Sequence, residues 1–347
     1  MNEVNLNCPL PFNQHSTVLL SHGGGGKHMR ELVENIIVKA FDNPTLRSLH
    51  DGAVIKEKNA RFAFTTDSYV ISPLVFRGGD IGSLSVHGTI NDLAMCGAKP
   101  LYLSCAFILE EGFPFTLFQK IIQSMQQAAM ACDVTIVTGD TKVVERGKAD
   151  GLYINTAGIG ILEHSFDISP KSIQIGDAVI LSGDIGRHGI AIMAEREGLS
   201  FDCPIESDSA PLWKPVRELF QERLSIHCLR DLTRGGLASA LVELASSSGL
   251  SIHTEEKAIP VKEEVAGACE ILGFDPIYVA NEGRFVAFVS KSEADRTVDI
   301  LRKFPMCENA CLIGYVGERG GKVFMKSKIG GERIVDMLSG EQLPRIC

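Results

Sequence analysis

A run of four glycines followed by a lysine stands near the N-terminus of the chain. Residues 21–27 read Ser-His-Gly-Gly-Gly-Gly-Lys and lead into a segment with apolar residues at helical spacing. Glycine-rich backbone before a helix can bring several N–H groups close to a phosphate, and a lysine adds positive charge. The pattern is not a P-loop, because the first glycine and the final serine or threonine of that motif are missing. Gly24, Gly25, Gly26 and Lys27 are candidate phosphate ligands, and a flexible loop with a surface lysine is the equal alternative.

Four aspartates stand at the ends of apolar stretches or beside glycine: Asp67, Asp92, Asp140 and Asp231. Carboxylates at strand ends can converge over one edge of a sheet. Mg²⁺ binds through a few oxygen ligands and usually brings substrate phosphates with it. Each aspartate taken alone is more typical of a helix cap or a turn. Their repetition favours a metal–phosphate site.

The last residue of the chain is a cysteine, Cys347, and its thiol stands beside the terminal carboxylate. Exposed free cysteines are usually avoided, so a terminal one calls for a chemical use. Three other residues have reactive side chains in polar or glycine-containing stretches: His87, Lys142 and Glu282. Taken alone, they are typical of a structural histidine, a solvated lysine and a turn residue.

The apolar periodicity predicts the elements that must position these groups. Helices are expected at 29–41, 82–98, 115–132, 189–196, 211–220 and 234–245, and strands at 61–68, 101–109, 134–138, 153–161 and 284–289. Pro100 is expected to end the second helix. Residues 139–142 are expected to form a loop after the strand at 134–138.

The length of 347 residues indicates about two domains. Strands and helices alternate in two successive units, which indicates an α+β or α/β protein. The predicted bounds are an N-terminal extension at 1–17, a domain with the glycine loop at 18–165, a second domain at 166–335 and a flexible tail at 336–347.

The composition narrows the class of partner and the compartment. The net charge of −9 argues against nucleic acid or an anionic membrane as the main partner. No apolar stretch approaches the ~18 residues that cross a bilayer, and the first residues lack the pattern of a secretory signal. A cytoplasmic protein is expected, with most of its ten cysteines reduced.

Five segments, taken together and in this order, resemble a known ATP-binding superfamily. They are Ser21–Lys27, Thr65–Ser68, Ser85–Ala94, Gly139–Val144 and Arg230–Gly236. The superfamily contains aminoimidazole ribonucleotide synthetase, selenophosphate synthetase and thiamine-monophosphate kinase. The terminal Pro-Arg-Ile-Cys narrows the resemblance to the carbamoyl dehydratase family of hydrogenase maturation factors, HypE. The resemblance covers nearly the whole chain.

The resemblance implies an N-terminal α/β domain whose strands form a barrel across a homodimer, followed by an α+β domain. It implies ATP near the dimer seam, under a mobile glycine loop. Asp67, Asp92 and Asp140 match the metal–phosphate aspartates of the family and imply Mg²⁺. Asn91 and Thr141 lie in the same motifs and are expected to contact the nucleotide.

The resemblance also implies a reaction on the tail. A carbamoyltransferase partner, similar to HypF, loads a carboxamide onto Cys347. ATP phosphorylates the carboxamide oxygen, Lys142 offsets charge, and Glu282 or His87 acts as the base. The product is a thiocyanate that supplies the cyanide ligand of NiFe-hydrogenase, through an iron-bearing scaffold similar to HypC–HypD.

Two alternative functions are weighed against the carbamoyl dehydratase function. Selenophosphate synthetase carries a cysteine or selenocysteine inside its glycine loop, and the loop at 23–26 has none. A non-catalytic carrier could use Cys347 to hold a persulfide or a metal. Such a carrier has no need of a triphosphate site, so the aspartates and the glycine loop count against it.

Overall fold

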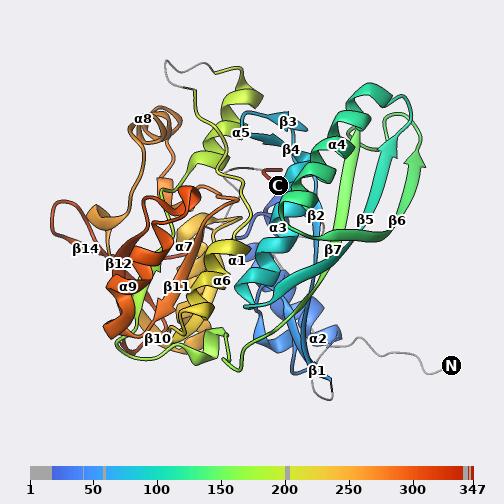
Figure 1. The fold of residues 1–347 in the computed structure, drawn as a ribbon. Helices are drawn as coiled ribbons and strands as arrows, with labels where there is room; N and C mark the ends of the chain where they lie inside the picture. Colours follow the sequence, from blue (N-terminus) through green and yellow to red (C-terminus); the bar gives the residue numbers. More distant parts are fainter. Residues whose placement is uncertain (1–17, 42, 58–59, 200–203, 339–342, 344) are drawn as a thin grey trace, which may run out of the picture.

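The computed structural model describes residues 18–41, 43–57, 60–199, 204–338, 343 and 345–347. The predicted extension at 1–17 lies outside the described residues. Each half of the chain forms one large sheet with helices packed on it, and the C-terminus lies between the two halves (Figure 1).

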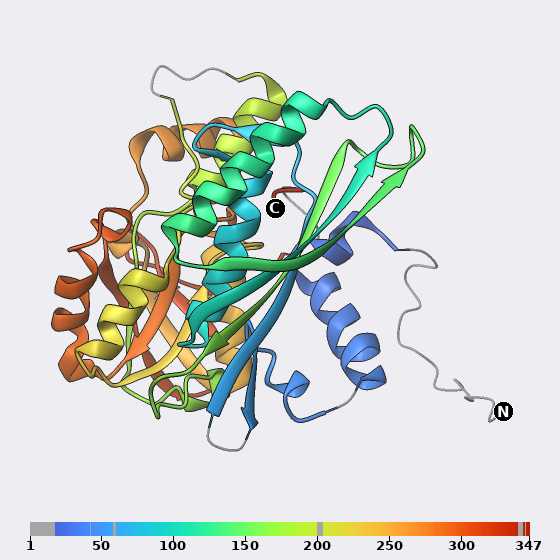
Figure 2. The ribbon, with the colours of Figure 1, turned by 45° about the vertical axis from the view of Figure 1, so that its right-hand side comes forward.

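The N-terminal sheet has five strands in the order β1-β2-β7-β5-β6. They are β1 (Ala53–Glu57), β2 (Ala60–Tyr69), β5 (Lys99–Glu110), β6 (Thr135–Val144) and β7 (Leu152–Ile161). Helices α3 (Ile81–Met95) and α4 (Phe115–Ala131) lie on one face of this sheet (Figure 2). A short hairpin of β3 (Val75–Phe76) and β4 (Gly79–Asp80) precedes α3.

The helix predicted at 29–41 is present as a continuous helical run. It consists of α1 (Lys27–Leu32), a π-helical turn (Val33–Ile37) and α2 (Val38–Ala40). The glycine loop therefore leads directly into a helix, as the sequence predicted.

Two local predictions were wrong. Helix α3 ends at Met95, and Gly97 turns the chain with φ +72°, so Pro100 does not end the helix. Pro100 instead lies in β5, at the register shift between Pro100 and Tyr102 in the pairing with β7 and before the pairing with β6 begins, and proline is tolerated at such an irregular position. Residues 139–142 are not a loop, because β6 continues to Val144 in parallel pairing with β5.

The C-terminal sheet has seven strands in the order β14-β13-β10-β12-β8-β11-β9. They are β8 (Ala178–Leu181), β9 (Ile226–Asp231), β10 (Leu250–Glu255), β11 (Phe285–Val289), β12 (Cys311–Arg319), β13 (Val323–Lys326) and β14 (Glu332–Val335). Its helices are α5 (Arg187–Glu197), α6 (Trp213–Gln221), α7 (Gly236–Ser248), α8 (Glu263–Leu272) and α9 (Ala294–Leu301).

The second sheet has apolar side chains on both faces, and for this reason helices pack on both of its faces. One apolar cluster joins the sheet to α7, and another joins it to α6 and α9. The interior strand β11, between β8 and β9, is buried along its whole length, as expected for a strand covered on both faces. A third cluster joins α3 and α4 to α5, α8 and the end of the tail, so it fastens the two halves together.

The predicted two-domain α+β class is confirmed, and the exact domain bounds remain a prediction. A barrel across a dimer is not visible in a single chain. In the described part of the chain, no helix has the length and apolar character needed to cross a membrane.

Candidate functional site

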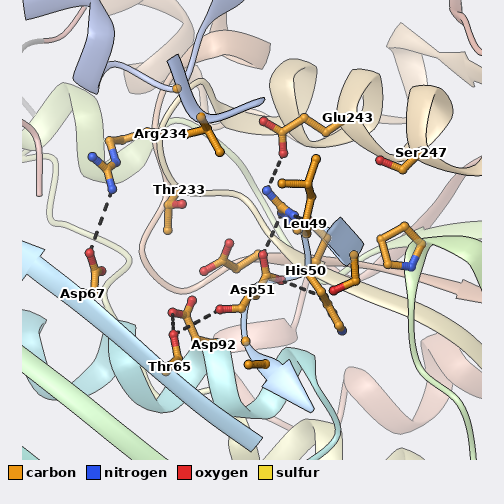
Figure 3. Close-up of a pocket in the computed structure, with 18 of the residues that line it drawn as sticks. Leu49, His50, Asp51, Thr65, Asp67, Asp92, Thr233, Arg234, Glu243 and Ser247 are labelled. Carbon is orange, nitrogen blue, oxygen red and sulfur yellow. Dashed lines mark hydrogen bonds and ion pairs between the residues drawn. The ribbon is translucent and has the colours of Figure 1, made fainter. Parts of the chain in front are cut away.

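A cavity of about 620 Å³ opens between the two halves of the molecule. Its walls come from the glycine loop, α1, the segment before β1, β2, α3, the end of β9 and α7. Gly25 and Gly26 contribute the loop wall. Figure 3 shows how the side chains of these separate elements face one another across the cavity.

Four carboxylates converge on this cavity: Asp51, Asp67, Asp92 and Asp231. Burial raises the pKa of Asp92 well above its usual value, and Asp231 and Asp67 raise it further. Burial likewise raises the pKa of Asp231 to about 8 and that of Asp51 to about 6. Carboxylates that share a buried site favour protonation or a bound cation, so this wall suits a metal ion.

Hydrogen bonds and ion pairs hold part of this acidic wall (Figure 3). The hydroxyl of Thr65 donates to Asp92 Oδ2 over 2.7 Å. Arg230 pairs with Asp51 over 2.9 Å and also with Glu243. Asp51 Oδ2 remains buried without a hydrogen-bond partner among the described residues. The acidic wall is therefore only partly neutralised by the protein.

Asp140 lies away from this wall in a single chain. Its strand β6 is the sheet edge, and pairing through β5 and β7 puts Asp140 three strands from Ser68 of β2. That separation is roughly 14 Å at about 4.8 Å per strand. The register aligns Asp140 with Ser68, and Asp67 is the residue before Ser68 on β2. Successive side chains of a strand point to opposite faces, so Asp67 and Asp140 lie on opposite faces of the sheet.

The metal set Asp67, Asp92 and Asp140 is therefore not assembled within one chain. Across the described ranges, no three His, Cys, Asp or Glu side chains are positioned to hold a metal ion together. Lys142 pairs with Asp140 over 2.8 Å on the exposed strand, and Thr141 lies between them. The roles of Asp140 as a metal and nucleotide ligand, of Thr141 as a nucleotide ligand and of Lys142 as a catalytic residue remain predictions.

Cys347 is docked between the two halves. An oxygen of its terminal carboxylate accepts from the N–H of Val70 over 3.0 Å, and the Arg345 carbonyl accepts from the N–H of Ser72 over 3.3 Å. Arg345 Nε donates back to the Val70 carbonyl over 2.9 Å. The end of the tail thus pairs with the segment that follows β2, and Cys347 is only 6% exposed.

Glu282 is a buried carboxylate whose charge raises the pKa of the Cys347 thiol. Burial raises the pKa of Glu282 well above the usual value, and Asp231 and Asp67 add to the shift. Its Oε1 is buried without a hydrogen-bond partner within the described part of the chain. An unpaired buried carboxylate is costly and is poised to take a proton.

Asn91 is a support for Glu282 in this structure. Its amide donates to the Glu282 carbonyl over 3.2 Å, and its oxygen accepts from the N–H of Leu212 over 2.8 Å. Asn91 is buried and is not among the residues that line the cavity. Its predicted contact with nucleotide remains a prediction.

His87 has a different neighbour. Its Nδ1 lies 3.1 Å from the hydroxyl of Ser209, and burial lowers its pKa to about 4. The ring is therefore neutral near pH 7. Gly88 lines the cavity, whereas His87 does not.

The glycine loop closes over the tail. Gly24 and Gly26 line a small gap that Leu343 and Ile346 line from the other side. Lys27 does not line the cavity, because its ammonium pairs with Asp336 over 2.6 Å. Its phosphate contact remains a prediction.

Sequence reasoning missed Asp51 and the two arginines of the site. Asp51 precedes a strand in an Asp-Gly pair, which reads as an ordinary turn. Arg234 donates to the Gly23 carbonyl over 3.0 Å and lies 3.9 Å from Asp67. It connects the glycine loop to the acidic wall, and its only sequence signal was its place before a glycine pair.

We expect docking to suppress the reactivity of Cys347. Burial raises the pKa of its thiol to about 12, Arg234 opposes the shift, and Glu282 adds to it. Thiolate is the reactive form, so alkylation should keep rising about tenfold per pH unit up to about pH 10. Mass spectrometry of the C-terminal peptide after timed iodoacetamide treatment measures this rate. The urea-unfolded chain is the control and should level off near its free-thiol pKa of about 8.5; a matching plateau in the folded chain contradicts docking.

Two family models match the chain, one for each half. The AIR synthase related protein, N-terminal domain, matches residues 49–162, and the corresponding C-terminal domain matches residues 174–326. A structure of a thiamine monophosphate kinase homologue, AaThiL complexed with AMPPCP and TMP, has a TM-score of 0.69 at 17% identity and supports the fold alone.

Carbamoyl dehydratase HypE of Cupriavidus necator is 49% identical to this chain and covers 99% of both proteins. HypE of Escherichia coli is 42% identical over 96% of this chain and all of the relative. A crystal structure of HypE in complex with ATP has a TM-score of 0.81 at 44% identity, covering 95% of this chain and all of that one. A HypE–HypF complex has a TM-score of 0.84 at 44% identity, covering 88% and 99%. The resemblance is confirmed: this chain belongs to the HypE family of carbamoyl dehydratases, built on the two AIR synthase related domains.

Proposed function

We propose that this chain dehydrates a carboxamide carried on its own Cys347 to a thiocyanate, at the expense of ATP. The docked tail carries this proposal. The terminal thiol is buried, and its pKa responds to the charges of the buried Glu282 and of Arg234, which lines the cavity walled by the glycine loop. The product supplies the cyanide ligand for the iron centre of NiFe-hydrogenase.

The atoms balance in two steps. The carboxamide oxygen attacks the γ-phosphorus of ATP and ADP leaves, and loss of one N–H proton gives an imidate phosphate on sulfur. Removal of the second N–H proton lets the C–O bond break. Phosphate departs with the electron pair, and the carbon–nitrogen bond becomes triple. Phosphate replaces oxide as the leaving group, which is why ATP is needed.

We assign the base to Glu282 rather than His87. Electrostatic coupling links Glu282 to the Cys347 thiol, and its raised pKa makes the carboxylate a stronger base. His87 has a lowered pKa and is bonded to Ser209. A weaker base with another partner is the less suitable proton acceptor.

ATP is the second substrate, and the cavity between the halves is its proposed site. The solved HypE–ATP complex concerns a relative with 44% identity that covers 95% of this chain. The carboxylates Asp51, Asp92 and Asp231 make the wall of this cavity acidic, which favours a cation that arrives with the nucleotide phosphates. We assign Mg²⁺ to Asp67 and Asp92, and to Asp140 of a second copy. When bound, the ion offsets negative charge on the transferring phosphoryl group.

A homodimer is needed to complete this site. Phe64, Ile159 and Tyr102 are cross-strand neighbours on the sheet face opposite the helices, and all three are exposed. Asp140 and Lys142 continue that face onto the open edge strand β6. Large apolar side chains gathered on one exposed face mark an interface, and a barrel with a second copy would cover them.

Replacing Lys142 with alanine should preserve the dimer and abolish turnover, because Lys142 offsets charge at the phosphoryl group. The dimer is measured by light scattering and turnover by phosphate release. Lys148→Ala is the matched control, since Lys148 is an exposed lysine just beyond β6.

A mixed dimer decides which chain Lys142 serves. One protomer carries Lys142→Ala and the other carries Cys347→Ala, with different affinity tags for purification. If Lys142 serves the partner's tail, one intact site remains, and about half of the parent rate returns. If Lys142 serves its own tail, the mixed dimer is inactive. Turnover near the parent level in the simple Lys142→Ala variant removes Lys142 from the phosphoryl site.

Loading needs a partner. The docked thiol has a pKa of about 12, so the tail must leave its site to react as a thiolate. We propose a HypF-like carbamoyltransferase for this step, supported by the HypE–HypF complex of a relative. An iron-bearing scaffold similar to HypC–HypD receives the cyanide, and a cytoplasmic location suits these partners.

Intact mass of the chain tests the function. The chain is incubated with the carbamoyltransferase and carbamoyl phosphate, and its mass is recorded before and after addition of Mg-ATP. A carbamoyl adduct on the last peptide that loses one water with ATP supports the proposal. An adduct that ATP leaves unchanged, or no adduct, contradicts it and favours the carrier alternative.

A further inference from the structure

Helix α5 holds the end of the tail through a fully buried histidine. His188 Nε2 lies 2.8 Å from the carbonyl of Ile346, the residue before the terminal cysteine. The other ring nitrogen, Nδ1, lies 2.8 Å from the hydroxyl of Ser207. One imidazole therefore joins the tail to a segment of the second domain.

The chemistry of the partners determines the tautomer. A carbonyl only accepts, so Nε2 carries the hydrogen and donates it to Ile346. Nδ1 of the neutral ring then accepts from the Ser207 hydroxyl. The Ser207 oxygen in turn accepts from the N–H of Ser209 over 3.0 Å. Every polar atom in this buried chain has a partner, so loss of one member leaves another unsatisfied.

Ser207, Asp208 and Ser209 form what we call the serine segment, and it touches both candidate bases. The Ser209 hydroxyl lies 3.1 Å from His87 Nδ1. The Asp208 carboxylate accepts from the N–H of Glu282 over 3.3 Å and from the next N–H, of Gly283, over 3.2 Å.

The backbones at this contact are very close. A Cβ on Gly283 would lie 2.0 Å from the Asp208 carbonyl, so a side chain there would displace the segment. Movement of the serine segment therefore moves the Glu282 loop.

We propose that His188 is a positioning residue for the dehydration. It holds the loaded tail in its docked position, and through Ser207 it also holds the serine segment against the loop that carries the base. The inference rests on the proposed function. His188 does not touch the reacting carbon. Its imidazole fixes the backbone one residue before the thiol, and through Ser207 it fixes the loop that carries Glu282. An undocked tail leaves His188 Nε2 without its acceptor, so docking and alignment of the base are linked.

Two amide substitutions separate the two ends of the imidazole. The amide of His188→Gln reaches the position of Nε2 and can still donate to the Ile346 carbonyl. The amide of His188→Asn reaches only the position of Nδ1, so it keeps Ser207 and loses the tail. The full-length chain is used for both variants, and each is loaded with carboxamide before the dehydration assay.

Two readouts are measured on each variant. The first is the alkylation rate of Cys347 in the unloaded chain, which reports how often the tail is undocked. The second is the dehydration rate against ATP concentration. We expect His188→Asn to raise alkylation and lower the maximal dehydration rate, each about tenfold, as for loss of one buried hydrogen bond. The ATP concentration at half-maximal rate should not change. His188→Gln keeps the tail docked, so its alkylation rate should stay within about threefold of the parent, and its loss of the Ser207 contact should slow dehydration as Ser207→Ala does.

Equal behaviour of the two variants overturns the proposal, since a merely structural histidine does not distinguish them. A His188→Asn variant with the parent's alkylation and dehydration rates also overturns the proposal. The same holds if its dehydration rate and its ATP affinity fall by the same factor. Ser207→Ala tests the second link, and remains informative if His188→Asn does not fold. It should slow dehydration while Cys347 stays protected, and a parent rate removes the link. The alkylation readout needs no turnover, so failure of the parent chain to lose water with ATP is recognised separately.

Discussion

Cys347→Ala should abolish formation of the thiocyanate and of any cyanide donor, while ATP binding and the fold are retained. The substitution removes the only atom on which the carboxamide is carried. The hydrogen bond from the N–H of Val70 to the terminal carboxylate of Cys347 does not involve the side chain, so the tail can still dock. Loss of one small buried group at the chain end costs on the order of 1 kcal/mol.

Three measurements check this result. Intact mass shows whether an adduct forms, thermal melting with and without Mg-ATP reports nucleotide binding, and transfer of labelled cyanide reports function. Cys132→Ala is the matched control, because Cys132 is a half-buried free thiol at the C-terminal cap of α4 and does not line the cavity. Retained cyanide donation by Cys347→Ala would mean that the tail is not the carrier.

Glu282→Gln should slow dehydration by about a thousandfold, the usual range for loss of a positioned general base. Loading with carboxamide should be unaffected, because it occurs with the tail released. Glutamine preserves the shape of the side chain and the backbone bonds to Asp208 and Asn91. The loss is thus expected in the rate of water loss at saturating ATP.

Stability provides a second readout for the same variant. The folded pKa of Glu282 is raised, so the folded state resists ionisation that the unfolded chain undergoes above its pKa of about 4.3. This residue therefore costs stability as pH rises through that value. Glu282→Gln removes the cost, and its melting temperature at pH 7 should equal or exceed that of the parent.

Two comparisons make the assignment decisive. Glu263→Gln, at an exposed glutamate of α8, is the matched control and should match the parent in rate and melting temperature. His87→Ala tests the rival base. A thousandfold loss in His87→Ala together with a near-parent rate in Glu282→Gln would transfer the role to His87.

The sequence by itself determined the class and the family, and it predicted that the C-terminal tail carries the reactive group. Local patterns were sufficient for this purpose: glycines before a helix, aspartates in ordered motifs, and a cysteine at the end of the chain. Most predicted helices and strands were confirmed because their apolar spacing reflects a single local period. The errors at Pro100 and at residues 139–142 arose where strand pairing, a non-local interaction, outweighed the usual local preference of proline and polar residues.

Only the tertiary structure decided which of the candidate residues meet. Asp140 does not lie at the acidic wall of its own chain, because strand order and register fix its distance from Asp67 and the sheet face from which its side chain projects. Glu282 is the proposed base rather than His87 because burial raises its pKa and its charge acts on the thiol, and burial is created by packing of two domains and a tail. Asp51, Arg234 and His188 entered the site the same way, from segments with ordinary local sequence. Convergence of side chains distant in sequence depends on the sum of many long-range contacts, and for that reason no local pattern encodes it.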